Sequence, residues 1–214
     1  MFQLQNIIPQ TLRDRPSMMH SGIWGKLVQL NPSECIKITA PSGTGKTTLI
    51  HFLYGLRNDY TGHILYQQQS LAQLSGEAIA VWRQQEYSIV FQDLRLFPQL
   101  SARENIELNR VLQNPYCLPA AVEEMADELG ITHIMQQPVH QCSYGEQQRI
   151  AIIRALVQPF NWLLMDEPFS HLDQANTSKA IALIERACKK RNAGMLVTNL
   201  DDDCFFNYTS TYHL

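Results

Sequence analysis

The sequence lacks the features that mark several other classes of protein. Its 214 residues contain no apolar run close to the roughly 18 residues needed to cross a bilayer. Residues 1–10 carry neither the basic stretch nor the apolar block of a signal peptide. There is no basic excess, since 17 Lys and Arg stand against 20 Asp and Glu for a net charge of −3. Because nucleic-acid binding by phosphate neutralisation favours a basic face, we expect a soluble, cytosolic protein that does not bind nucleic acid.

Cysteine pairs are also absent. The five cysteines are odd in number and widely scattered, and no Cys-x-x-Cys pair occurs. This excludes a zinc ribbon and a thioredoxin-type site, and we expect reduced thiols that pack as small apolar residues. With 45% apolar and 17% charged residues, the chain has enough apolar surface to bury a substantial core.

Strand patterns and helix patterns alternate along most of the chain. Strands are predicted at 2–7, 23–30, 34–39, 63–66, 87–92, 161–166 and 195–198, and helices at 46–56, 144–157 and 174–190. Between about residues 93 and 141, apolar residues recur at helical spacing without a convincing strand, which indicates a helical insert. Strands separated by helices predict parallel crossovers, so we expect an α/β domain.

A glycine-rich segment joins the strand predicted at 34–39 to the helix predicted at 46–56. It reads Ala40-Pro41-Ser42-Gly43-Thr44-Gly45-Lys46-Thr47-Thr48 and fits the P-loop pattern G-x-x-x-x-G-K-[ST] after the first position. The alternative, a glycine-rich turn with a chance lysine, does not account for the strand–loop–helix context. Gly43 and Gly45 would let backbone N–H groups curl around phosphate oxygens, while the start of the helix attracts the same anion.

The side chains of this loop have expected roles of their own. Lys46 would hold the β- and γ-phosphates of a nucleotide, and the Thr47 hydroxyl would ligate Mg²⁺. Ala40 stands at the first glycine of the pattern, and because alanine disfavours positive φ, we expect the start of the loop to be slightly altered. The residues expected to bind ATP are Ser42, Gly43, Thr44, Gly45, Lys46, Thr47 and Thr48.

An acidic pair ends the apolar strand predicted at 161–166. Asp166 can hold Mg²⁺ directly or through water, and Glu167 can orient or deprotonate an attacking water. Alone, the pair is explained equally well by a buried strand with an exposed acidic turn. Together with the P-loop, it predicts a site for nucleotide hydrolysis.

Further segments follow in an order that resembles the ATP-binding subunits of ABC transporters, over about residues 34–200. Residues 142–149 resemble the signature sequence of that family, and residues 170–173 its D-loop, which ends in Asp173. Gln92 resembles the Q-loop glutamine, and Asn199 stands where the family has the H-loop histidine. The stretches 91–98 and 101–106 look most like the lipoprotein-release, macrolide-export and cell-division branch.

The resemblance implies a fold and a set of partners. The fold would be a P-loop NTPase core with a mostly parallel sheet, an N-terminal antiparallel β part, and a helical subdomain at about 93–150 between the Q-loop and the signature. Residues 1–214 would form a single ABC ATP-binding domain with ATP and Mg²⁺ as cofactors. Two such domains, identical or different, would sandwich ATP head to tail, with Ser143 and the Gly145 N–H touching the γ-phosphate held by the other subunit.

The resemblance also assigns the catalytic roles and the function. It implies Thr47, Gln92 and Asp166 as metal ligands, and Glu167, Gln92 and Asn199 as catalytic residues. The expected function is an ATPase subunit that powers a membrane transporter, docked on a permease near the Q-loop and helical insert at the cytoplasmic face. The alternative is a degenerate subunit with little hydrolysis, acting as half of a heterodimer or as a regulator. A role on DNA or ribosomes is disfavoured, because those relatives usually carry two nucleotide domains or a long coiled-coil insert.

Departures from the family pattern predict slow hydrolysis. Asn199 keeps a hydrogen-bond donor but cannot carry charge, and Tyr144 puts a ring where the signature has its first glycine. Residues 8–17 offer no aromatic side chain to stack on adenine, and Trp24 falls inside the strand predicted at 23–30, where a core role is expected. Losing one preorganised contact costs about 2–4 kcal/mol of transition-state stabilisation.

Three aspartates at 201–203 are expected to cap a following helix.

Overall fold

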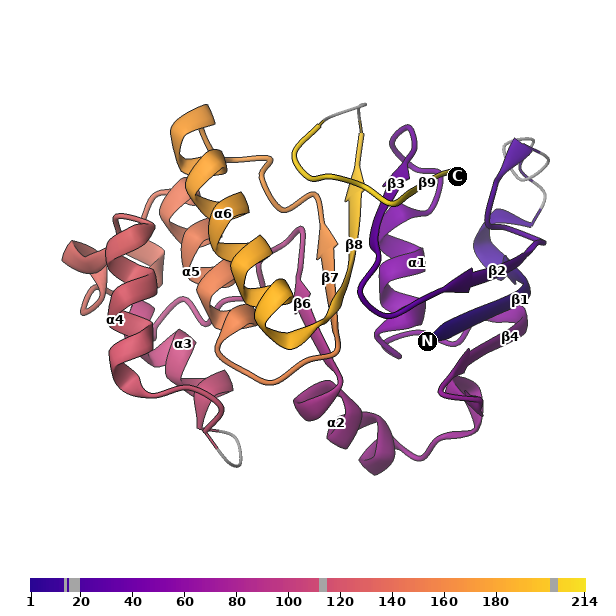
Figure 1. Ribbon diagram of the computed structural model, residues 1–214, viewed down its shortest axis with the longest axis horizontal. Helices are drawn as coiled ribbons and strands as arrows, with labels where there is room; N and C mark the ends of the chain where they lie inside the picture. Colours follow the sequence, from indigo (N-terminus) through magenta and orange to yellow (C-terminus); the bar gives the residue numbers. More distant parts are fainter. Residues whose placement is uncertain (14, 16–19, 112–114, 201–203) are drawn as a thin grey trace.

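Two β-sheets and the helices packed on them form the chain (Figure 1). A computed structural model describes residues 1–13, 15, 20–111, 115–200 and 204–214. The first sheet has the order β2-β1-β4-β5 and the second the order β6-β7-β8-β3-β9. The predicted cap at 201–203 lies outside the described residues.

The first sheet is antiparallel and confirms the predicted N-terminal β part. Its strands are β1 (Phe2–Pro9), β2 (Leu27–Leu30), β4 (Tyr60–Tyr66) and β5 (Gln69–Ser70). The pairing of β1 with β4 shifts register between Gln5 and Ile8. Gly62 faces this irregularity with φ +84°, and a Cβ there would lie 2.4 Å from backbone oxygens of Gln5 and Asn6. Only glycine fits so close a backbone approach.

The second sheet is parallel, as the alternation of strands and helices predicted. Its strands are β3 (Cys35–Thr39), β6 (Tyr87–Val90), β7 (Trp162–Asp166), β8 (Gly194–Asn199) and β9 (Ser210–His213). In register, Thr39 lies opposite Asn199, and Asp166 opposite Thr198. The carboxyl ends of β3, β7 and β8 therefore meet at one edge, where open α/β sheets bind ligands.

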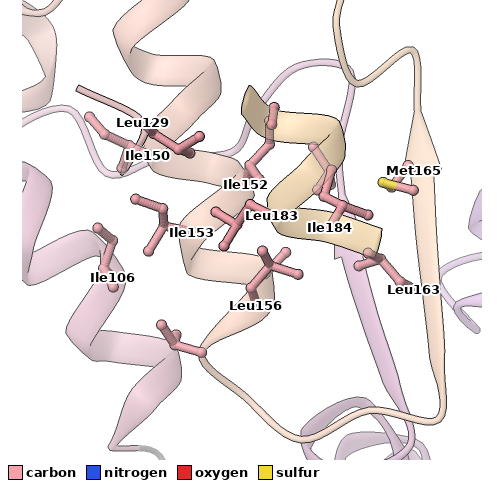
Figure 2. Close-up of a cluster of buried hydrophobic side chains, with 14 of the residues drawn as sticks. Ile106, Leu129, Ile150, Ile152, Ile153, Leu156, Leu163, Met165, Leu183 and Ile184 are labelled. Carbon is pink, nitrogen blue, oxygen red and sulfur yellow. The ribbon is translucent and has the colours of Figure 1, made fainter. Parts of the chain in front are cut away.

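Helices cover both faces of the parallel sheet. They are α1 (Lys46–Leu53), α2 (Gly76–Gln85), α3 (Ala102–Arg110), α4 (Pro119–Glu128), α5 (Tyr144–Leu156) and α6 (Gln174–Arg191). Neighbouring residues of β7 point to opposite faces: Leu163 and Met165 join a cluster with α5 and α6, whereas Trp162 and Leu164 join one with α1 and the first sheet. Figure 2 shows the first cluster, with Leu183 of α6 beside α5.

The predicted helical insert is also observed. Between Asp93 and Gln141 the described residues form α3, α4 and short 3-10 turns, with an isolated bridge between Ser101 and Pro138 as the β pairing present there. Ser101 caps α3 in a capping box, since its hydroxyl accepts the Glu104 N–H while the Glu104 carboxylate accepts the Ser101 N–H. In Figure 1, α3 and α4 lie beside α5 on the side of the sheet away from α1.

Several features differ from the sequence prediction. The strand predicted at 23–30 begins only at Leu27, and Trp24 lies in the preceding turn, where it is 2% exposed. The predicted core role of Trp24 is confirmed, but its place in a strand is wrong. Helix α2 and edge strand β9 were not predicted, because α2 has no fully buried face and β9 is a short strand of alternating exposure.

The cysteines and the helices agree with the compositional expectations. None of the five cysteines, all of which lie within the described residues, forms a disulfide, and Cys35, Cys142 and Cys188 are buried. Across the described ranges, none of the helices combines the length and the apolar character needed to pass through a membrane.

Candidate functional site

The P-loop wraps around the start of α1 at the carboxyl end of β3. Gly43 and Gly45 take left-handed backbone angles, with φ +78° and +108°, and a Cβ on Gly45 would lie 2.6 Å from Leu12 Cδ1. Both glycines are therefore required by the loop geometry. Ala40 is not among the residues with positive φ. The start of the loop therefore holds alanine without a left-handed backbone angle.

Lys46 is folded into the curl of this loop. Its ammonium donates to the carbonyl oxygens of Ala40 at 2.7 Å and Pro41 at 3.2 Å, and lies 3.5 Å from Glu167 Oε1. The side chain is only 6% exposed, so the charge is held by backbone dipoles and one carboxylate. These contacts place the Lys46 ammonium inside the loop that is predicted to bind phosphate.

Three side chains from separate elements meet beside Lys46. The Thr47 hydroxyl of α1 donates to Gln92 Oε1 at 3.3 Å, and Gln92 Nε2 donates to Glu167 Oε2 at 3.3 Å. Gln92 follows β6 and Glu167 follows β7, so the parallel sheet brings them to the same edge as the P-loop. Glu167 has φ +47°, a sparsely populated angle for a residue with a Cβ, and its N–H donates to the Thr198 carbonyl at 3.2 Å.

Asp166 and Glu167 are neighbours with different surroundings. Asp166 is 1% exposed, and its Oδ1 accepts a hydrogen bond of 2.5 Å from the Thr198 hydroxyl. Glu167, which is partly exposed, turns toward Lys46 and Gln92. Oxygen donors of this kind, the Thr47 hydroxyl, the Gln92 amide oxygen and the Asp166 carboxylate, are the ligands that Mg²⁺ prefers, so the donor set fits that ion.

A single cavity combines most of the residues predicted to bind the nucleotide. It is lined by Leu12, Ser42, Gly43, Gly45, Lys46, Thr47, Thr48, Gln92 and Glu167. Thr44 is not part of this lining; its hydroxyl donates to the Pro41 carbonyl at 2.7 Å and its carbonyl accepts the Trp24 indole N–H at 3.4 Å. Thr44 therefore stabilises the loop through these two hydrogen bonds and does not line the cavity.

Two residues near the P-loop were not predicted. Leu12 lines the cavity, and the Arg15 guanidinium donates to the Gly43 carbonyl at 2.7 Å. Both residues come from the polar stretch before β2. An isolated leucine among polar residues was the one sign in that stretch that a side chain there contacts another part of the protein. No pattern in the sequence connects that stretch to the loop.

The signature residues lie at the start of α5, outside this cavity. Ser143 caps the helix, accepting the Glu146 N–H at 3.4 Å while its own N–H and hydroxyl donate to Glu146 Oε2 at 2.8 Å. A Cβ on Gly145 would lie 3.1 Å from the His171 carbonyl oxygen. The Tyr144 ring is 56% exposed and packs edge-on to His171, with centroids 4.4 Å apart. The signature thus contacts its own D-loop rather than its own P-loop.

Asn199 and Asp173 are both tied to nearby backbone. Asn199 ends β8, its carbonyl accepts the Ala40 N–H at 3.3 Å, and its Oδ1 accepts the Leu200 N–H at 2.8 Å. Asn199 is therefore adjacent to the start of the P-loop, but it does not line the cavity. Asp173 caps α6 by accepting the Asn176 N–H at 2.8 Å, and this backbone hydrogen bond holds the pKa of Asp173 below its usual value.

Comparison with known proteins gives consistent matches. The family model described as ABC transporter matches residues 27–170. The glucose import ATP-binding protein GlcV of Saccharolobus solfataricus is 34% identical over 81% of this chain, which spans 50% of that relative. The lipoprotein-releasing system ATP-binding protein LolD of Idiomarina loihiensis is 33% identical over 67% of this chain, which spans 64% of that relative.

The fold comparison agrees with the sequence comparison. The dimeric structure of MJ0796, a bacterial ABC transporter cassette, superposes with a TM-score of 0.80 over 94% of this chain and 88% of that chain, at 22% identity. A post-hydrolysis dimeric structure of the same cassette with ADP and Pi gives a TM-score of 0.77. The predicted fold class, a parallel core with an antiparallel part and inserted helices, is thereby confirmed.

Proposed function

The chain belongs to the ABC transporter family of ATP-binding proteins, and we propose that it binds and hydrolyses ATP to power a membrane transporter. The observation that carries this proposal is the convergence of Lys46, Thr47, Gln92 and Glu167 in one cavity. These residues come from three separate places in the chain, and each has the chemistry that phosphoryl transfer to water requires.

In the proposed reaction, each residue acts on a different part of the nucleotide. The P-loop N–H groups and the Lys46 ammonium would bind the β- and γ-phosphates and stabilise the charge that develops on them. Glu167 would accept a proton from the attacking water, and the Gln92 amide would orient that water beside it. Bound Mg²⁺ would supply further neutralisation of phosphate charge, held by Thr47, Gln92 and Asp166.

The proposed assembly is a head-to-tail dimer, with an identical or a different subunit. Ser143 and Gly145 lie outside the cavity of their own chain, at the first turn of α5, and the backbone N–H groups at the start of a helix attract anions. In a dimer these groups would contact the γ-phosphate held by the partner. The dimeric MJ0796 cassette supports this arrangement by its similar fold. Residues 1–214 would act as one ABC ATP-binding domain, with the helical subdomain at about 93–150.

We further propose that a permease subunit holds the protein at the cytoplasmic face of the membrane. The transported substrate is not specified by the relatives, since one is a glucose import protein and the other belongs to a lipoprotein-releasing system. Phe97 supports a docking position near Gln92, because its ring is 56% exposed while its backbone N–H and carbonyl are bound by the buried Asn105 amide. A fixed, exposed aromatic ring of this kind suits an apolar contact.

Replacing Phe97 tests this docking. The tagged protein, purified from detergent-solubilised membranes, is expected to retain a protein with membrane-spanning segments, and Phe97→Asp is expected to reduce its yield about tenfold. Leu27→Asp is the matched control, since Leu27 is 76% exposed on the first sheet, away from α3 and α4. Equal recovery with both variants, measured by mass spectrometry, would count against docking at Phe97.

The second candidate function, a subunit with little hydrolysis, is favoured by the position of the Asn199 amide. Its oxygen is bound to the Leu200 N–H at 2.8 Å, and an asparagine side chain is shorter than a histidine and cannot carry charge. A weak contact to the γ-phosphate would lower the rate of hydrolysis and leave ATP binding to Lys46 and the P-loop. Slow turnover is therefore the expected behaviour of the wild type.

Restoring histidine separates the two candidates. Asn199→His is expected to raise steady-state phosphate release about tenfold, equivalent to ~1.4 kcal/mol, because imidazole reaches further and can be positively charged in the transition state. Asn199→His combined with Tyr144→Gly tests the second departure, and Glu167→Gln provides the background rate. Negligible release in all of them, with ATP binding shown by calorimetry, would support the non-hydrolysing function. Brisk wild-type release unchanged by either substitution would show that Asn199 is a competent replacement.

A further inference from the structure

The turn that follows Gln92 has an unfavourable backbone conformation. Leu94 and Arg95 are consecutive residues with Cβ atoms, and both are left-handed, with φ +57° and +46°. Such angles bring Cβ close to the backbone, so a pair of them in sequence is unfavourable and is stabilised by further contacts. The turn itself provides two short-range hydrogen bonds, from the Leu94 N–H to the Phe91 carbonyl at 3.1 Å and from the Arg95 N–H to the Asp93 carbonyl at 2.6 Å.

The outside support comes from Arg154 on α5. Its guanidinium donates from Nη1 to the Arg95 carbonyl at 2.7 Å and from Nη2 to the Leu94 carbonyl at 2.5 Å. Both acceptors belong to the left-handed residues. The fork of two N–H donors on a planar guanidinium fixes two neighbouring carbonyls at once, which fixes the peptide geometry between them.

Arg154 is also placed where a charge is costly. It is 8% exposed, and within the described part of the chain no carboxylate forms an ion pair with it. Burial lowers the pKa of Arg154 to about 10, so the group is still charged at neutral pH. A buried cation needs hydrogen bonds as compensation for its lost hydration, and the two turn carbonyls supply them.

The conformation of this turn determines where Gln92 lies. The Arg95 guanidinium packs over the Phe91 ring, 4.1 Å from its centroid, and lies 3.3 Å from Asp93 Oδ1, so residues on both sides of Gln92 are attached to the same turn. The Gln92 side chain is exposed and makes its two hydrogen bonds to Thr47 and Glu167 at 3.3 Å each. Hydrogen bonds of this length are weak, so the position of the Gln92 amide depends on the backbone conformation at Gln92.

We propose that Arg154 is a positioning residue for Gln92: by holding the carbonyls of Leu94 and Arg95, it keeps the turn left-handed and the Gln92 amide between Thr47 and Glu167. The proposal deepens the proposed ATPase function and rests on it for its catalytic consequence. Its structural consequence, the shape of the turn, is independent of any activity and can be tested separately.

The turn is tested by limited proteolysis. Arg95 is exposed and provides a trypsin site at the turn. The rate of cleavage after Arg95 therefore reports whether the turn keeps its folded conformation. We expect cleavage after Arg95, followed by mass spectrometry, to be about tenfold faster in Arg154→Met than in the wild type, with Arg154→Lys between them, because lysine keeps the charge but loses the fork. If Arg154→Met does not fold, Arg154→Lys alone is compared with the wild type. Equal cleavage rates in folded variants overturn the proposal.

A second test uses the backbone strain itself. Arg95→Gly and Arg95→Ala both remove the contacts to Phe91 and Asp93, but only glycine takes a left-handed angle without a Cβ penalty. In the Arg154→Met background, Arg95→Gly is expected to give about threefold faster hydrolysis than Arg95→Ala, whereas in the wild-type background the two are expected to differ little. Identical behaviour of glycine and alanine without Arg154 contradicts a role in holding the turn.

The metal dependence separates positioning from general destabilisation. Arg154→Met is expected to need about tenfold more Mg²⁺ for half-maximal hydrolysis while its affinity for ATP in EDTA, measured by calorimetry, stays within about twofold of the wild type. A parallel loss of ATP affinity indicates a merely structural role and overturns the proposal. Lys46→Ala serves as the inactive reference: a wild-type rate no higher than that of Lys46→Ala refutes the proposed function, and the proteolysis result then decides the role of Arg154.

Discussion

Glu167→Gln is expected to reduce ATP hydrolysis by about a hundredfold or more while ATP stays bound, because an amide cannot accept the proton of the attacking water. Glutamine has the shape of glutamate, and its amide oxygen can still accept the Gln92 N–H that now lies 3.3 Å from Glu167 Oε2. The substitution therefore removes the base and one ion pair with Lys46, and leaves the packing of the site unchanged.

The same variant tests the proposed dimer. Without turnover, ATP is expected to remain between the P-loop of one subunit and the start of α5 in the other, so light scattering should detect a doubled mass with Mg-ATP and a monomer without nucleotide. The wild type under the same conditions is the control. Hydrolysis at the wild-type rate would contradict the role of Glu167. An unchanged mass in saturating ATP would contradict a homodimer and indicate a different partner subunit.

Lys46→Ala is expected to weaken ATP binding by about 10- to 150-fold, equivalent to ~1.5–3 kcal/mol, because a charge-assisted contact to the phosphates is lost. The substitution also removes the donors that bind the Ala40 and Pro41 carbonyls, so the loop loses internal support together with its charge. Both effects act in the same direction on nucleotide affinity.

Calorimetry of the purified protein with ATP measures this loss. Lys26→Ala is a suitable control, since Lys26 is an exposed lysine in the turn before β2 and does not line the cavity. Melting temperatures of both variants show whether the P-loop change also unfolds the domain. An affinity for ATP that is equal in wild type and Lys46→Ala would contradict the phosphate-binding role of this lysine.

The sequence alone determined the features that depend on short segments. The P-loop and the acidic pair at the end of β7 are each written in fewer than about ten consecutive residues, because phosphate and Mg²⁺ sites need particular residue types at fixed spacing. Hydrophobic alternation then gave the parallel strands and the helical insert, and parallel strands necessarily bring their carboxyl ends to one edge. The family resemblance implied that Thr47, Gln92 and Glu167 act at one site, and in the structure hydrogen bonds join Gln92 to both of the others.

Other features depended on contacts between distant segments. No sequence pattern indicated that Arg15 binds the Gly43 carbonyl, that β9 extends the sheet beside β3, or that Arg154 holds the turn after Gln92. In each case the position of a segment depends on a contact with residues far along the chain, and no periodicity in the sequence predicts such a contact. For the same reason Trp24 was predicted in a strand, whereas it lies in a turn and its indole N–H donates to the Thr44 carbonyl of the P-loop.

The direction in which a side chain turns was also left to the tertiary structure. Asp166 and Glu167 are adjacent acids in the sequence, yet one is enclosed against Thr198 while the other, at φ +47°, faces Lys46. Asn199 stands at the expected place at the end of β8, but its amide oxygen binds the Leu200 N–H. Residue type and spacing determine which groups reach the edge of the sheet, whereas backbone angles and packing at that edge determine which of them face the cavity.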